Sequence, residues 1–109
     1  MKNKIFTIPI NFKVSGTKIF VPFRAMCSVT DKEFSGEVVI EYHPKDKVLE
    51  YVDAERVINE ISKEKTTAEK LNYDIYSIIK KSINPRFLKV TVDVIHSKAH
   101  CPVQLWIES

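Results

Sequence analysis

A cysteine at the end of an apolar stretch is the residue of this chain best suited to chemistry. Cys27 follows the apolar residues 19–26 and opens a polar turn that runs to Glu33. A thiol between a strand and a turn is accessible to a substrate, and its thiolate is a nucleophile. The structural alternative is a cysteine buried as a small hydrophobe. Taken alone, Cys27 favours the structural alternative.

Carboxylates could supply proton transfer to such a thiol. Asp31 and Glu33 follow Cys27 in the turn, and Glu69 is distant in sequence. A nearby negative charge raises a thiol pKa, so an acid helps only if it donates or accepts a proton itself. For Glu69 the spacing favours a capping box, because residues 66–69 read Thr-Thr-Ala-Glu before an apolar helical repeat.

A metal site is the second chemistry to consider. His96, His100 and Cys101 could join Cys27 as mixed nitrogen and sulfur ligands of zinc. Their spacing matches no tight ligand pair such as C-x-x-C, and His96 continues the strand alternation of residues 90–94. We therefore expect no metal. The sequence also contains no glycine-rich phosphate loop, so we expect no cofactor held by one.

Strands and helices must position these side chains. Short segments rich in β-branched and aromatic residues predict strands over 5–14, 18–29, 36–43, 87–96 and 103–107, with a first hairpin turn at Gly16. Between the third strand and the last pair, a helical period predicts two amphipathic helices. Their apolar stripes are Ala54, Val57, Ile58 and Ile61, then Leu71, Ile75, Ile78, Ile79 and Ser82. The second helix should end before Asn84-Pro85.

The order of these elements predicts an α+β fold. The helices are grouped rather than alternating with strands, so we expect a two-layer unit with a four-stranded antiparallel sheet and both helices on one face. The other face and the sheet edges stay open. Open edges are often closed by another copy of the chain, so we expect a homo-oligomer.

Composition limits the class of protein. The chain has 109 residues, of which 44% are hydrophobic, and no linker-like tract, so residues 1–109 should form a single domain. With two cysteines, no secretory signal and no apolar stretch long enough for a membrane span, we expect a soluble cytoplasmic protein. The net charge is +3. Charge permits an RNA partner, although on charge alone a solvated helix face is favoured for the lysines at Lys63, Lys65, Lys70, Lys80 and Lys81.

Four short motifs resemble a known family. They are Cys27-Ser28-Val29-Thr30, residues 37–44 (Glu-Val-Val-Ile-Glu-Tyr-His-Pro), Ala68-Glu69, and residues 84–90 (Asn-Pro-Arg-Phe-Leu-Lys-Val). Together they are similar to the tunnelling-fold (T-fold) enzymes that handle 7-cyano-7-deazaguanine. These enzymes are the nitrile reductase of queuosine synthesis (QueF) and the short QueF-like amidinotransferase that makes archaeosine in tRNA. The similarity covers about residues 23–94, and the chain length is close to that of the short relative.

The resemblance implies roles for individual residues. Cys27 would attack the nitrile carbon and form a covalent thioimide, and Glu69 would bind the guanine-like edge of the base. Ala68 stands where relatives often have histidine. The resemblance also implies ring-shaped homo-oligomers with substrate pockets between subunits.

Two departures from the family matter. Residues 49–56 replace the nicotinamide-binding stretch of the reductases, so hydride transfer is disfavoured. The family has a proton-transferring aspartate seven residues after the cysteine, and here that position is Phe34. Glu33 or Asp31 could substitute for it. We therefore expect Cys27, Glu33 and Asp31 as catalytic residues, and Glu69 and Phe34 in substrate binding.

The sequence thus favours an amidinotransferase that acts on tRNA containing 7-cyano-7-deazaguanine, with ammonia or another nitrogen donor. The thiol of Cys27 would add to the nitrile, and the nitrogen donor would then displace it. The alternative is a non-catalytic T-fold protein that binds a deazapurine, a pterin-like base or RNA, because Phe34 replaces the aspartate. A nitrile reductase that uses NADPH is the third reading.

Overall fold

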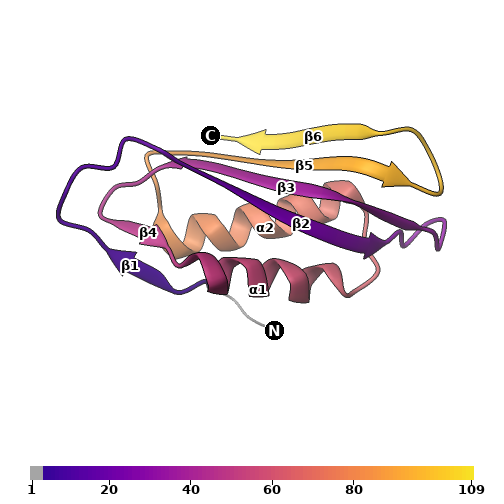
Figure 1. Cartoon of the computed structure of the whole chain (residues 1–109), viewed down its shortest axis with the longest axis horizontal. Helices are drawn as coiled ribbons and strands as arrows, with labels where there is room; N and C mark the ends of the chain where they lie inside the picture. The colour runs from indigo at the N-terminus through magenta and orange to yellow at the C-terminus, as the bar shows by residue number, and fades with distance from the viewer. Residues whose placement is uncertain (1–3) are drawn as a thin grey trace.

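The computed structural model describes residues 4–109 as an α+β fold (Figure 1). In chain order the elements are β1 (Thr7–Pro9), β2 (Thr17–Met26), β3 (Glu33–His43), β4 (Lys47–Leu49), α1 (Tyr51–Ser62), α2 (Ala68–Ile83), β5 (Phe87–Ser97) and β6 (Val103–Glu108). The main sheet is antiparallel with the strand order β2-β3-β5-β6. The predicted four-stranded antiparallel sheet is confirmed.

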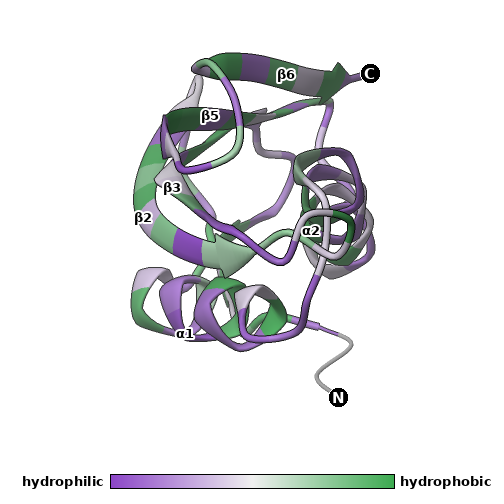
Figure 2. Ribbon diagram, turned by 90° about the vertical axis from the view of Figure 1, so that its right-hand side faces the viewer, coloured by the Kyte–Doolittle hydropathy of each residue, from purple (hydrophilic) through white to green (hydrophobic). Residues whose placement is uncertain are grey.

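Both helices cover the same face of this sheet, as Figure 2 shows when the molecule is viewed from its end. Strand alternation explains which face they cover, because Val21, Phe23 and Ala25 are buried while the residues between them are exposed. In β3 and β5 the corresponding buried residues are even-numbered: Phe34, Val38, Ile40 and Tyr42, then Leu88, Val90, Val92 and Val94. Among the described residues, 4–109, no helix covers the opposite face of the sheet.

The helices bury the apolar stripes that their sequences predict. Ala54, Val57 and Ile58 of α1 are buried, as are Leu71, Ile75, Ile79 and Ser82 of α2, while Ile61 and Ile78 are partly buried. Helix α2 ends where expected, because Asn84 takes a left-handed conformation with φ 42° and caps the helix before Pro85. No helix within residues 4–109 is long and apolar enough to cross a membrane.

The start of the chain differs from the prediction. Residues 5–14 were expected to form a full strand paired to the next one through a hairpin at Gly16, but only β1 (Thr7–Pro9) is a strand, and it pairs with β4. This prediction was wrong because Pro9 has no N–H to continue a ladder. The following residues loop to β2, and Ile10 N donates to the Asp46 carbonyl at 2.9 Å.

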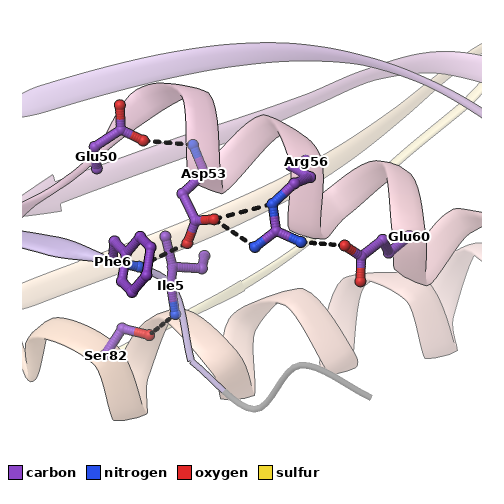
Figure 3. Close-up of polar contacts among 7 residues, drawn as sticks. All are labelled: Ile5, Phe6, Glu50, Asp53, Arg56, Glu60 and Ser82. Atoms are coloured by element: carbon purple, nitrogen blue, oxygen red, sulfur yellow. Dashed lines mark hydrogen bonds and ion pairs between the residues drawn. The ribbon is translucent and has the colours of Figure 1, made fainter.

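Polar contacts fix this first segment to both helices (Figure 3). Ile5 N donates to Ser82 Oγ of α2 at 2.9 Å, and Phe6 N donates to Asp53 Oδ2 of α1 at 2.7 Å. Asp53 is only 6% exposed, and a carboxylate buried to this extent requires hydrogen bonds or ion pairs to offset its lost hydration.

The same aspartate organises the start of α1. Glu50 caps the helix by accepting from Asp53 N at 2.5 Å, and Arg56 Nη2 pairs with Asp53 Oδ1 at 2.5 Å. Arg56 also pairs with Glu60 one turn further along (Figure 3). Glu50, Asp53 and Arg56 lie in the stretch 49–56, and they connect the start of α1 to the N-terminal segment.

A register shift changes the direction of side chains near one end of the sheet. Strand β3 begins at Glu33 rather than at Gly36, and Ile95 of β5 is an extra residue opposite the Ser35/Gly36 step. A Cβ on Gly36 would lie 1.9 Å from the Asp93 carbonyl oxygen, so only glycine fits there. The bulge also breaks the predicted alternation at His96, which pairs with Ser35 and is exposed.

Candidate active site

A tight turn holds Cys27 at the end of β2. Cys27 N donates to the Lys32 carbonyl at 2.9 Å, and the Cys27 carbonyl accepts from Asp31 N at 2.9 Å. Asp31 closes the turn in the left-handed region with φ 60°, a conformation that aspartate tolerates better than most residues. The cysteine is partly buried against the edge of the core, and the three residues after it are exposed.

The segment between the helices lies directly beside this turn. Thr66 N donates to the Met26 carbonyl, and Ser28 N donates to the Thr66 carbonyl, both at 2.9 Å. These bonds form a parallel bridge between Cys27 and Thr66. Since α2 begins at Ala68, the bridge holds the first turn of that helix next to the cysteine.

Hydrogen-bond donors of the turn act on the sulfur atom. The Thr30 hydroxyl, followed by the backbone N–H groups of Thr30 and Val29, lowers the pKa of the Cys27 thiol below its ordinary value. Burial and the negative charge of Glu69 oppose this effect. The turn therefore shifts the Cys27 thiol toward its thiolate, which is the reactive form. The sequence analysis assigns no role to the Thr30 hydroxyl, and the only signal for one is its position three residues after Cys27 in the polar turn.

Glu69 lies in the first turn of α2 with an exposed side chain. The predicted capping box was wrong by one residue, because Thr67 is the N-cap and its Oγ1 accepts from Lys70 N at 3.1 Å. Thr66 is instead used in the bridge to Cys27. Within residues 4–109, Glu69 makes no side-chain hydrogen bond or ion pair, and its charge lies close enough to influence Cys27. The structure thus brings the predicted nucleophile and the predicted base-binding acid together.

Asp31 is the acid that belongs to the cysteine turn itself. Its Oδ1 lies 2.5 Å from Lys65 Nζ in the segment between the helices, and both side chains are largely exposed. An exposed ion pair of this kind is weak and exchanges readily with solvent or a ligand. Asp31 is therefore available at the same end of the sheet as Cys27.

Glu33 and Phe34 lie on opposite faces of the sheet. Glu33 pairs with Arg24 on the open face, with a distance of 3.7 Å between Arg24 Nε and Glu33 Oε2. Phe34 is 4% exposed and packs edge-on against Phe23 under the helices, with ring centroids 5.8 Å apart. The alternation of β3 thus directs Glu33 away from the side on which Cys27 packs, and it makes Phe34 a core residue.

The sequence offers His96, His100, Cys101 and Cys27 as alternative zinc ligands. Within residues 4–109, no group of three or more His, Cys, Asp and Glu side chains could hold a metal ion.

A groove of about 690 Å³ lies between the outer surfaces of α1 and α2. Lys65 and Thr66 line it, whereas Cys27 and Glu69 do not. The partly buried cysteine and the exposed acid therefore lie outside this groove.

Comparison with known proteins places these features in a family. The family model described as GTP cyclohydrolase I matches residues 14–102. A solved structure described as the archaeosine synthase QueF-Like in the apo form superposes with a TM-score of 0.81 at 23% identity, covering 90% of this chain and 96% of that chain. No curated protein matches the chain by sequence. The likeness to the solved structure establishes the T-fold, and the chain belongs to the GTP cyclohydrolase I family.

Proposed function

We propose that this protein is an amidinotransferase that converts a nitrile on a deazaguanine base of tRNA into an amidine. The observation that carries the proposal is a thiol with a lowered pKa beside a carboxylate that has no side-chain partner within residues 4–109. Hydrogen bonds in its own turn lower the pKa of the Cys27 thiol, and the Thr66 bridge holds Glu69 beside it. The similarity to an archaeosine synthase agrees with this chemistry.

In the first step, the thiolate of Cys27 adds to the nitrile carbon of 7-cyano-7-deazaguanine. A C–S bond forms, one π bond of the nitrile breaks, and its electron pair goes to the nitrogen, which takes up a proton. The product is a covalent thioimide. Asp31 is the acid best placed to move that proton, because it lies in the cysteine turn whereas Glu33 faces the other side of the sheet.

In the second step, ammonia adds to the thioimide carbon. The resulting tetrahedral carbon loses the thiolate as the C–S bond breaks, and a proton from the ammonia nitrogen goes to the sulfur through the same acid. The base then carries an amidine, and Cys27 is regenerated. No electrons are transferred, so the reaction needs no redox cofactor.

Glu69 would hold the base in place. A carboxylate can accept two hydrogen bonds from the planar N–H edge of a guanine-like ring, and this geometry is bidentate. The first turn of a helix favours a charged carboxylate at that position because of the helix dipole. A base in RNA must leave its stack to reach this site, so the RNA substrate has to be locally open.

A second copy of the chain would enclose the site. Strands β2 and β6 lie at the two ends of the strand order, so each has one unpaired edge that could pair with another protomer. Cys27 directly follows the edge strand β2. A homo-oligomer built through these edges would add side chains of the neighbouring protomer around the thiol.

Intact-mass measurement after mixing the protein with 7-cyano-7-deazaguanine tests the first step. We expect a mass increase equal to the whole ligand, because addition to a nitrile loses no atoms. The adduct should persist in Cys101→Ser, whose thiol is exposed elsewhere, and should be lost in Cys27→Ala. Ammonia should then release the amidine. The absence of an adduct at saturating ligand would refute the proposal.

A binding protein without catalysis is the second candidate. The observation that favours it is Phe34, a core residue at the position where related enzymes have their proton-transferring aspartate. In that case the protein would bind the base through Glu69 without forming the thioimide. Calorimetry would then show binding that Glu69→Gln removes and Cys27→Ala leaves unchanged. NADPH oxidation in the presence of the nitrile would instead indicate a reductase.

A further inference from the structure

A cavity of about 420 Å³ lies at the end of the sheet opposite Cys27. The loop between β1 and β2, the turn after β3 and the start of β5 form it, and in Figure 1 these segments gather at the left end, away from the β2–β3 turn. Two backbone hydrogen bonds join the segments: Ile10 N to the Asp46 carbonyl at 2.9 Å and Arg86 N to the His43 carbonyl at 2.8 Å. The cavity is therefore built by the fold and does not depend on one flexible side chain.

The lining of this cavity is positively charged. Lys13, Lys45 and Arg86 contribute three cations, His43 adds a titratable ring, and no Asp or Glu is among the lining residues. Within residues 4–109 none of the three cations forms an ion pair. Several other cations of the chain do pair with acids: Lys18, Arg24, Arg56, Lys65 and Lys70. The cations of the cavity are thus free to bind an external anion.

Aromatic rings accompany these charges. Phe12 lines the cavity, and 67% of its surface is exposed, so the ring is accessible to a ligand. The His43 ring packs against Phe87 with centroids 4.9 Å apart. Cations beside an exposed aromatic ring are the combination that binds single-stranded nucleic acid, since the cations contact phosphates while a base stacks on the ring.

We propose that this cavity, formed around Lys13, Lys45 and Arg86, binds backbone phosphates of RNA, with Phe12 as a stacking surface for a base. The inference rests on the proposed function, because the RNA is the substrate that carries the modified base. Strand β2 has 10 residues, and it separates the cavity from Cys27 by about 33 Å at 3.3 Å per residue. The cavity would therefore hold the substrate by its backbone, far from the reacting base.

Binding of fluorescently labelled tRNA at several salt concentrations tests this site. We expect the triple variant Lys13→Gln, Lys45→Gln, Arg86→Gln to bind at least about tenfold more weakly at low salt and to lower the slope of log affinity against log salt by about 2 to 3, because each lost phosphate contact removes 0.7 to 0.9. Phe12→Ala should weaken binding without changing the slope, since stacking releases no counterions.

The matched control removes the same charge from the helices. Lys63→Gln, Lys80→Gln, Lys81→Gln changes three lysines that form no ion pair within residues 4–109, so it should leave the slope nearly unchanged. Equal losses in the two triple variants, or an unchanged slope in the cavity variant, would overturn the proposal. Circular dichroism and thermal unfolding establish that both variants are folded.

This result is separable from the proposed function. Adduct formation between Cys27 and the free base 7-cyano-7-deazaguanine requires no RNA, so the cavity variant should form it at the wild-type rate. If the adduct forms and the cavity variant binds tRNA normally, this inference alone fails. If tRNA binding depends on the cavity but no adduct forms, the proposed reaction fails and the RNA site stands.

Discussion

The start of α2 offers the sharpest test of the site, because helix capping and base binding are assigned to two different residues there, Thr67 and Glu69. Thr67 accepts a hydrogen bond from Lys70 N at 3.1 Å, whereas Glu69 has no side-chain partner within residues 4–109. We therefore compare Thr67→Ala with Glu69→Gln. The first variant should lose stability and the second should lose ligand binding.

The magnitudes follow from the two roles. Loss of a threonine N-cap costs about 1 kcal/mol, within a range of about 0.5 to 2. For a domain of 109 residues this loss corresponds to a fall in Tm of about 3 to 6 °C. The effect of Glu69→Gln on stability comes only from the lost interaction with the helix dipole, about 0.3 to 1 kcal/mol. Its effect on ligand binding comes from the lost charged hydrogen bonds to the base, so affinity should fall about 10- to 100-fold.

Urea unfolding measures the first effect, and calorimetry with 7-cyano-7-deazaguanine measures the second in a Cys27→Ala background, where no covalent adduct forms. Thr67→Ser keeps the hydroxyl and should restore stability, which makes it the matched control. If Glu69→Gln destabilises the protein as much as Thr67→Ala does, the carboxylate stabilises the helix beyond the dipole interaction, and the separation of the two roles fails. If Glu69→Gln also binds the base with wild-type affinity, the proposed role of this carboxylate is refuted.

Three further variants probe the surrounding structure. In a chain with Cys27 as its only cysteine, Thr30→Val should raise the pKa of the thiol and move the pH dependence of alkylation by iodoacetamide to higher pH, whereas Thr30→Ser should not; no movement would show that the hydroxyl does not contact sulfur. Gly36→Ala should destabilise the protein by at least about 3 kcal/mol in urea, because its Cβ would overlap a backbone oxygen of β5 at 1.9 Å; a smaller loss would mean that the bulge can relax. Tyr42→Phe should cost about 1 to 3 kcal/mol, measured by thermal unfolding, because the buried Leu49 N–H loses the oxygen that accepts from it at 3.0 Å; a neutral effect would indicate that water replaces it.

Periodicity predicted the elements that carry the core. Alternation in β2, β3 and β5 and the helical stripes of α1 and α2 reflect burial directly, so the residue pattern was sufficient. In the N-terminal segment the apolar residues do not reflect burial in this way. Phe6, Ile8 and Phe12 look like strand residues, but all three are exposed, and only the short β1 pairs with β4. A three-residue strand such as β4 has too few residues to show a period at all.

The site depended on details finer than a pattern can resolve. Thr66 and Thr67 are equally good caps by type, and the choice between them came from the bridge between Thr66 and the Cys27 turn. The sequence predicts Glu33 in the turn after Cys27 and the third strand from Gly36. Once β3 begins at Glu33, alternation sends this carboxylate to the open face. The strand start, three residues before the predicted one, therefore decides on which face of the sheet this carboxylate lies.

The opposing influences on Cys27 suggest why the thiol and Glu69 are placed together. In the free protein, Thr30 lowers the pKa of the thiol, while the charge of Glu69 raises it. A guanine-like base that donates two N–H groups to Glu69 would offset that charge and leave the hydrogen bonds of the turn unopposed. The thiolate would then be favoured most when the substrate is bound. The acid that slightly disfavours the nucleophile in the empty site would thus couple its activation to recognition of the base.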